Sequence, residues 1–225
     1  MTYSILIGQR LYSSWSLRGW LPFAVHDIPV TVHDTLIYSD TFSTDVSNFG
    51  GSGTVPVVRT PHGGVLSDSL AICWGLTDAF PERGLLPNDP VDRAKAQSLI
   101  TEMHSGFTAL RGACPMNLAT GWVGFKPNAA VQADIARIDE IWSAALDASD
   151  GPFLFGTYGI VDAFFAPVAI RIAGYALPVS DTAMAYVHAQ LSIPAIQEWR
   201  AEGLARDAEL SQYEMPLERC PFPMP

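Results

Sequence analysis

The sequence is poor in basic residues, which limits the partners that the protein can have. Its 225 residues include 13 Lys and Arg against 23 Asp and Glu, giving a formal net charge of -10 at pH 7. An acidic surface repels nucleic-acid phosphates and anionic lipid headgroups. We therefore expect no nucleic-acid and no membrane partner. An anionic ligand would have to be held by local donors, such as helix N-termini, backbone N–H groups or a few arginines.

Cysteine is also scarce. The 3 cysteines, Cys73, Cys114 and Cys220, lie far apart and form no CxxC pair. An odd, scattered set does not make a disulfide framework, so a reducing compartment is expected. The N-terminus, MTYSILIGQR, lacks the basic start and long apolar stretch of a secretory signal. The predicted location is cytoplasmic.

Membrane spans and metal motifs are missing too. The longest apolar stretch, Ile160–Val179, contains Asp162, Pro167 and Arg171, which would be costly in lipid. We interpret it as a buried core helix. The 5 histidines show neither HExxH nor a Cys/His metal spacing, so no metal is predicted. An apolar content of 48% with 16% charged residues is typical of a globular protein.

The order of elements predicts an α+β fold in two domains. Residues 1–80 carry a β-α-β and then a β-β-α pattern, which indicates a four-stranded mixed sheet with helices. The Pro- and Gly-rich residues 81–90 are predicted to be a linker, and residues 91–225 a helical domain. The proline-rich tail from Tyr213 is expected to be an extended strap without a regular element. The expected strands are Tyr3–Gly8, Val30–Leu36, Thr54–Val58 and Gly64–Leu66, and the expected helices are Ser16–His26, Ser69–Phe80, Val91–Leu110, Val131–Leu146, Ile160–Ala173, Asp181–Leu191 and Pro194–Ala205.

Three serines, Ser13, Ser14 and Ser16, cluster where the first helix should begin. One interpretation is an ordinary N-cap. The other is a hydroxyl that donates a hydrogen bond to a bound thiolate. Lowering a thiol pKa from about 8.5 by about two units needs roughly 2.7 kcal/mol. One hydrogen bond to a charged group contributes about 1.5–3 kcal/mol, and the helix dipole adds to it.

Two further loops have a structural and a functional interpretation. Val55-Pro56 is a candidate cis peptide, whose bend would turn the backbone of Val55 outward to pair with a bound peptide; the alternative is a strained edge strand. Asp68 and Ser69 precede the next helix, either as a cap or as a grip on an α-amino acid. In the second case Ser69 would hold a carboxylate and Asp68 would accept from an ammonium group.

Together, these three loops resemble the cytosolic glutathione transferase superfamily. The resemblance implies a thioredoxin-like first domain, an all-helical second domain, glutathione as co-substrate, a small electrophile as second substrate, and a homodimer. The loop from Ser13 to Ser16 looks most like serine-type, zeta-like members, whose first serine activates the thiol. This implies Ser13 as the catalytic residue, although Ser14 beside it stays open. The implied glutathione-binding residues are Ser14, Trp15, Thr54, Val55, Pro56, Asp68, Ser69 and Asn117.

The second domain also carries parts of the resemblance. Pro115–Leu118 is similar to a zeta-like segment and brings in Asn117. Glu102–Phe107 with Arg111 resembles a bacterial subgroup. His104 and Arg111, seven residues apart and so expected on one helical face, would line the second-substrate pocket with Tyr12; a solvated or capping pair is the alternative. Asp162 occupies the family's structural capping motif.

The resemblance implies a glutathione S-transferase. An alternative is a glutathione-dependent cis-trans isomerase like maleylacetoacetate isomerase, whose dicarboxylate substrate calls for an arginine. That arginine is expected near Gly174, whereas Arg171 lies a turn earlier. The residues also leave open a non-catalytic glutathione-binding or regulatory protein of the same fold and a cysteine-type oxidoreductase.

Overall fold

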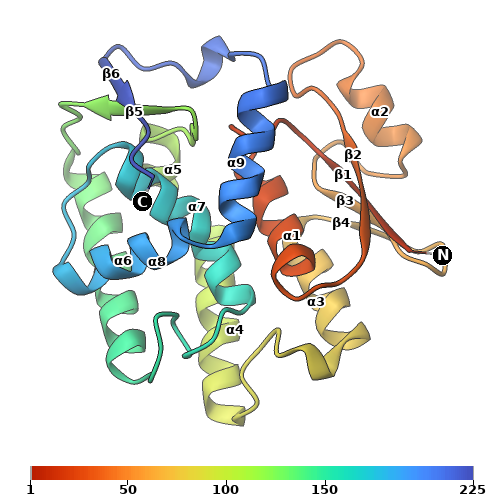
Figure 1. Cartoon of the computed structure of the whole chain (residues 1–225), viewed down its shortest axis with the longest axis horizontal. Coiled ribbons are helices and arrows are strands. Elements are labelled where there is room, and N and C mark those ends of the chain that lie inside the picture. Colours follow the sequence, from red (N-terminus) through yellow and green to blue (C-terminus); the bar gives the residue numbers. More distant parts are fainter. Residues whose placement is uncertain (1, 225) are drawn as a thin grey trace.

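A four-stranded mixed sheet forms one side of the molecule in the computed structural model, which describes residues 2–224 (Figure 1). The strand order is β2-β1-β3-β4. β1 runs parallel to β2 and antiparallel to β3, and β4 is antiparallel to β3. The thioredoxin-like arrangement expected from the sequence is confirmed. The strands are β1 Tyr3–Ile7, β2 Val30–Asp34, β3 Val57–Arg59 and β4 Val65–Ser67.

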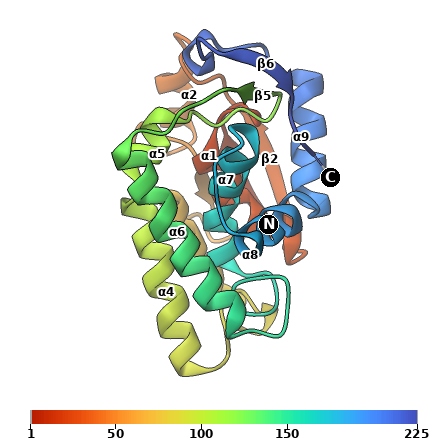
Figure 2. The same cartoon turned by 90° about the vertical axis from the view of Figure 1, so that its left-hand side faces the viewer.

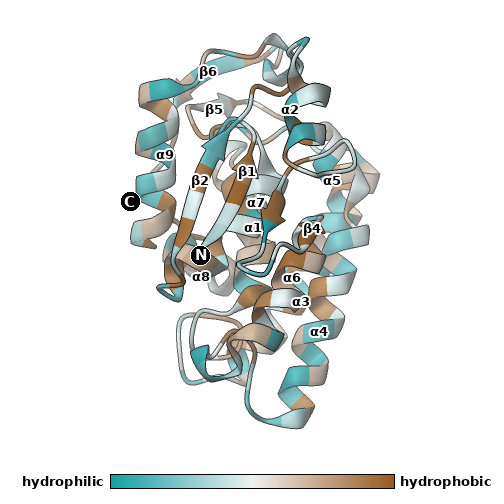
Figure 3. Ribbon diagram, turned by 90° about the vertical axis from the view of Figure 1, so that its right-hand side faces the viewer, coloured by the Kyte–Doolittle hydropathy of each residue, from teal (hydrophilic) through white to brown (hydrophobic). Residues whose placement is uncertain are grey.

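The central strand β1 ends in three buried apolar residues, Ile5, Leu6 and Ile7, because its two faces belong to two cores. Ile5 and Ile7 are buried in the main core with residues of α1 and α3, whereas Leu6 packs with Val46 of α2. Successive side chains of a strand point to opposite faces, so this alternation places helices on both sides of the sheet. Figure 3 shows β1 as a hydrophobic strand in the middle of the sheet. The helices are α1 Ser14–Val25, α2 Phe42–Asn48 and α3 Ser69–Ala79.

A helical second domain follows a connection that contains η1, Pro81–Arg83. Its centre is α7, in which every residue of Ile160–Gly174 except Ala173 is buried. α7 packs against α1 of the sheet domain and against α4 and α8, so the predicted core helix is confirmed. The long helices α4 and α6, next to each other in Figure 2, are joined by an ion pair between Glu102 and Arg137. The helices are α4 Pro90–Ser105, α5 Thr108–Ala113, α6 Ala129–Asp147, α7 Ile160–Gly174, α8 Asp181–Leu191, α9 Pro194–Arg206 and η2 Ser211–Tyr213.

The predicted single helix Val91–Leu110 is wrong, because the chain breaks between α4 and α5. Gly106 ends α4, and a Cβ there would lie only 2.6 Å from the carbonyl oxygen of Glu102. Phe107 then adopts a positive φ of 52° before α5 begins. An amphipathic pattern continues across this break, so periodicity alone does not reveal it.

The expectation that the tail from Tyr213 has no regular element is also wrong, because it contains a β-strand. β6, Glu218–Pro221, pairs antiparallel with β5, Thr120–Val123. A proline at the end of an edge strand gives up no ladder hydrogen bond that the strand requires. The short helix α2 and the strand β5 also went unpredicted, because each is too brief for a periodic signal.

The peptide bond between Val55 and Pro56 is cis, as expected. β3 starts after it, at Val57, rather than at Thr54 as the sequence suggested. Among residues 2–224, no helix combines the length and the apolar character needed to cross a membrane.

Candidate active site

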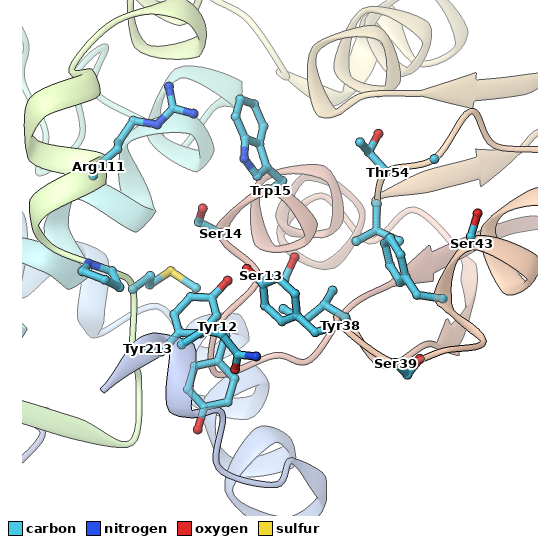
Figure 4. A pocket seen from close by; sticks show the side chains of 18 of the residues that line it. Tyr12, Ser13, Ser14, Trp15, Tyr38, Ser39, Ser43, Thr54, Arg111 and Tyr213 are labelled. Atoms are coloured by element: carbon cyan, nitrogen blue, oxygen red, sulfur yellow. The ribbon is translucent and has the colours of Figure 1, made fainter. Parts of the chain in front are cut away.

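A cavity of about 820 Å³ lies where the sheet domain meets the helical domain (Figure 4). One side consists of the start of α1, the loop after β2 and the loop before the cis proline. The other consists of α5, the segment after it, α7 and the tail. The lining residues are Tyr12, Ser13, Ser14, Trp15, Ile37, Tyr38, Ser39, Asp40, Phe42, Ser43, Gly53, Thr54, Val55, Thr108, Arg111, Gly112, Pro115, Met116, Arg171, Gln212 and Tyr213.

Ser13 is the N-cap of α1 and is buried at the cavity wall. Its Oγ accepts a hydrogen bond from the backbone N–H of Ser16 at 3.3 Å and donates to Ser16 Oγ at 2.7 Å. Ser16 Oγ also accepts from the N–H of Gly8 at 3.0 Å. The cap interpretation of the serine cluster is therefore realised. It does not compete with a functional interpretation, because a helix N-terminus also favours negative charge.

Ser14 is the first helical residue and is half-buried. It lines the cavity, and Figure 4 shows it between Trp15 and Tyr12. Within residues 2–224 its hydroxyl makes no hydrogen bond, in contrast to that of Ser13. Both serines thus line the cavity.

The loop before Ser13 is held by residues of the helical domain. The N–H of Leu11 donates to Asp207 Oδ2 at 2.8 Å, and its carbonyl accepts from the N–H of Leu118 at 3.1 Å. The indole N–H of Trp199 donates to the carbonyl of Arg10 at 2.7 Å. These contacts fix where α1 begins. Sequence reasoning missed them, because their partners lie more than 100 residues away along the chain.

The sheet-domain wall is ordered by polar contacts of its own. Gln9 Oε1 accepts from the N–H of Ile37 at 2.7 Å, and Thr35 donates to Asp45 Oδ2 at 2.9 Å. These bonds position the loop that brings Tyr38 and Ser39 to the cavity. Thr54 and Val55, which the sequence singled out, line the same side.

An aromatic cluster closes the end formed by the tail. The ring of Tyr213 lies 4.8 Å from that of Tyr12 and 6.4 Å from that of Tyr38, measured between centroids. Tyr12 was predicted to line the second-substrate pocket, whereas Tyr213 and its neighbour Gln212 were not singled out. No local pattern could have marked them, because the tail meets the cavity through contacts with residues far away along the chain.

Basic side chains surround the ring of Trp15 at the cavity wall. The guanidinium carbons of Arg18 and Arg111 each lie 4.8 Å from its ring centroid, and the ring of His104 is 5.2 Å away. Arg18 is completely buried, and burial above all lowers its pKa, with further lowering by Arg171 and Arg111. Burial likewise lowers the pKa of His104, against the opposing effect of Asp68.

Five of the residues named from the sequence do not line the cavity: Pro56, Asp68, Ser69, His104 and Asn117. Pro56 is buried against α1 at Gly19, and Asn117 Oδ1 accepts from the N–H groups of Ala119 and Thr120. Asn117 thus shapes its own loop.

Asp68 and Ser69 begin α3, as predicted. Asp68 is the N-cap, with a φ of 82°, and accepts from the N–H of Leu70 at 2.7 Å. Its other oxygen lies 3.7 Å from His104 Nε2. Ser69 is fully buried, and within residues 2–224 its Oγ has no hydrogen-bond partner.

His104 and Arg111 do not share a helical face, since the break at Gly106 and Phe107 lies between them. Arg111 instead folds back, and its Nη1 donates to the carbonyls of His104 and Gly106, each at 3.2 Å. Arg111 reaches the cavity, whereas the His104 side chain faces Asp68 and Trp15.

None of the three cysteines lines the cavity in the part of the chain that the structure describes. Cys73 and Cys114 are buried, and burial raises the pKa of both thiols, that of Cys114 to about 12. Cys220 is partly buried in β6 and lies off the cavity. Among residues 2–224 no three His, Cys, Asp or Glu side chains gather as a metal-binding group.

Comparison with known proteins bears on both domains. Residues 12–79 match the family model described as Glutathione S-transferase, N-terminal domain. Human glutathione S-transferase omega-2 is 28% identical over 126 residues, which is 56% of this chain and 50% of that protein. The chain spans about half the length of the curated relatives it matches.

Solved structures resemble nearly the whole chain. A glutathione transferase homologue from Burkholderia gl BGR1, with bound glutathione, has a TM-score of 0.69 at 20% identity and covers 92% of this chain and 100% of its own. Glutathione transferase Omega 3C from Trametes versicolor has a TM-score of 0.68 at 20% identity and covers 93% of this chain and 91% of its own. At these identities the likeness establishes the fold.

Proposed function

We propose that this chain, whose residues 12–79 match the N-terminal domain of glutathione S-transferases and whose fold is that of glutathione transferases, binds glutathione in this cavity and activates its thiol for attack on a small electrophile. The observation that carries the proposal is the start of α1, where Ser13 and Ser14 face a cavity shared by both domains. Residues 1–80 would bind glutathione and the helical domain the electrophile.

Ser13 is our candidate for the activating residue, with Ser16 as its partner. A hydroxyl hydrogen rotates to suit its surroundings, and the two oxygens are only 2.7 Å apart. When a thiolate binds, Ser16 can donate to Ser13, which frees the Ser13 hydrogen to donate to sulfur. Ser16 still accepts from Gly8 in that arrangement. Ser14, whose hydroxyl is free within residues 2–224, is the competing candidate.

The rest of glutathione would extend along the sheet domain. The backbone of Val55, next to the cis proline, can pair with the peptide in the manner of an added strand. The γ-glutamyl end would extend beyond the cavity lining to the N-terminus of α3, where the Asp68 carboxylate is partly exposed and can accept from its ammonium group. Thr54 and Trp15 line the path between.

Conjugation is the reaction that we propose, ahead of a zeta-like isomerisation. The isomerase resemblance expects an arginine near Gly174, which packs against Phe222 and does not line the cavity, whereas Arg171, a turn earlier, does line it. The alternative of a non-catalytic glutathione-binding protein is tested by turnover, which such a protein would lack. In keeping with the superfamily we also propose a homodimer, which light scattering of the purified protein would test.

The deciding experiment compares Ser13→Ala and Ser14→Ala with wild type. Calorimetric titration measures glutathione affinity, and ultraviolet thiolate absorbance across pH measures the pKa of the bound thiol. We expect Ser13→Ala to bind glutathione within a few-fold of wild type but to raise the thiol pKa by about 1–2 units, the equivalent of one charged hydrogen bond. Turnover should fall in parallel.

Ser13→Ala also removes a helix cap, so it needs a matched control. Asn128 caps α6 by accepting from the N–H of Val131 at 3.0 Å, outside the cavity. Asn128→Ala should cost a similar amount of stability, about 1 kcal/mol, without changing the thiol pKa. If the thiol pKa rises only in Ser14→Ala, Ser14 is the activating residue. If the wild-type protein binds no glutathione, the proposed function is refuted.

A further inference from the structure

Two arginines line the cavity without an acidic partner. Arg171 of α7 is 5% exposed, and its Nε and Nη1 donate to the carbonyls of Cys114 and Pro167 at 2.8 and 3.0 Å. Arg111 of α5 likewise uses only backbone carbonyls, those of His104 and Gly106. None of the ion pairs within residues 2–224 includes either arginine.

The chain shows elsewhere how a buried arginine is usually neutralised. Arg10 has the same exposure of 5%, yet it forms ion pairs with Asp34 and with Glu202, the latter at 3.0 Å. Burying a charge without a counter-charge is costly, even when neutral carbonyls satisfy part of its hydrogen-bonding capacity. In a chain with net charge -10, acidic side chains are plentiful, so their absence beside Arg171 stands out.

The charge of Arg171 is also not cancelled by the other cavity residues. Asp40 is the acidic residue of the lining, and it follows Ser39, which Figure 4 shows at the opposite end from Arg111. Within residues 2–224, Nη2 of Arg171 makes no hydrogen bond, which leaves it for a ligand. Burial, and then the positive charge of Arg111, lower the pKa of Arg171 to about 10, so it remains charged at neutral pH.

We propose that the second substrate carries a carboxylate, and that Arg171, with Arg111 beside it, binds this group. The neighbouring walls are Tyr12, Tyr213 and Met116, which suit a flat aromatic or unsaturated body. The substrate class is thus an anionic aromatic or conjugated electrophile. This inference rests on the proposed function and adds the chemistry of the second substrate to it.

A matched pair of electrophiles tests the proposal. In 4-chloro-3,5-dinitrobenzoate and 1-chloro-2,6-dinitrobenzene the reacting carbon has the same neighbours, and only the first carries a carboxylate. In both, the thiolate sulfur forms a C–S bond at the chlorine-bearing carbon, the C–Cl bond breaks, and chloride leaves with the electron pair. The thiol proton has already passed to solvent. Each kcat/KM is divided by the uncatalysed rate constant with glutathione.

We expect wild type to favour the benzoate by about 10- to 100-fold after this normalisation, the value of one charged hydrogen bond or pair. Arg171→Gln should remove most of that preference, chiefly through KM, while the neutral substrate changes by a few-fold at most. Arg111→Gln should act in the same direction, and it keeps the test open if Arg171→Gln does not fold. Arg200→Gln is the control, because Arg200 bonds the carbonyl of Leu118 and lies over Phe222, off the cavity.

Binding without turnover gives a second readout. The glutathione conjugates of the two electrophiles, titrated by calorimetry, should show the same preference and the same loss in Arg171→Gln. Equal normalised efficiency for both electrophiles in wild type would overturn the inference while the transferase stands. The inference would also be overturned if Arg171→Gln weakened the binding of glutathione itself, since the arginine would then bind the co-substrate. If neither glutathione nor either conjugate binds, the proposed function fails and the inference fails with it.

Discussion

Replacing Asp162 by alanine should destabilise the fold by about 3 kcal/mol, as a balance of two opposing effects. Asp162 is fully buried at the start of α7 and accepts three hydrogen bonds. The donors are the N–H of Leu154 at 3.1 Å, the N–H of Gly159 at 2.9 Å and the hydroxyl of Tyr186 at 2.8 Å. The carboxylate therefore joins α7 to α8 and to the loop before it.

Removing the carboxylate leaves three buried donors without an acceptor, at about 1–3 kcal/mol each. It also relieves the cost of burying a charge. Burial raises the pKa of Asp162 to about 6 from an ordinary 3.8, even though the three hydrogen bonds act to lower it. That difference of about two units corresponds to roughly 3 kcal/mol. The cost of three unsatisfied buried donors exceeds the gain from no longer burying a charge, so the substitution lowers the stability of the fold.

The pH dependence has a definite sign. Because the folded-state pKa of Asp162 is raised, the folded protein binds the proton more tightly, and stability from this group is present at low pH and is lost as the pH rises through about 6. Wild type should gain about 1 kcal/mol from this group between pH 7 and pH 5, and the alanine variant should not. The cost of the substitution should therefore be larger at pH 5.

Urea unfolding followed by circular dichroism at both pH values measures these free energies. Asp139→Ala is the control, since Asp139 accepts from the N–H of Ser180 at the exposed start of α8. It should cost only about 1 kcal/mol. The reasoning would be refuted by a loss below about 1 kcal/mol at pH 7 for Asp162→Ala, or by a cost that shrinks on acidification.

Three other perturbations test separate parts of the structure. Arg18→Met removes a buried charge that has no hydrogen-bond partner within residues 2–224, and it should stabilise the fold by about 1–4 kcal/mol, seen as a higher thermal midpoint; a lower midpoint contradicts this. Gly106→Ala should lower the thermal midpoint, because the new Cβ would lie 2.6 Å from the Glu102 carbonyl oxygen. Gly112→Ala is the control: a Cβ at Gly112 has no atom within 4 Å, so the midpoint should stay unchanged or rise. Alkylation of the native protein, followed by mass spectrometry, should modify Cys220 first and leave transferase turnover intact; turnover lost together with the buried thiols would favour a cysteine-type oxidoreductase.

Much of the fold follows from local sequence. The apolar stretch Tyr3–Gly8, the cis proline at position 56 and the helical spacing after residue 131 each depend on residues close together in the chain. Ser13 and Asp68 were recognised for the same reason, because a helix cap is a local device. Where a local rule had an exception, as at Gly106, the prediction of a single helix was wrong.

The complete cavity, by contrast, depends on contacts across the whole chain. Tyr213, from the tail, packs there against Tyr12, and Arg171 reaches it because α7 is buried between α1 and α4. The start of α1 is itself held by Asp207 and Trp199. The sequence by itself determined most of the helices and strands and the serine loop, since these arise from short-range periodicity and capping. Only the tertiary structure decided which distant side chains face those serines, because packing between domains leaves no periodic trace in the sequence.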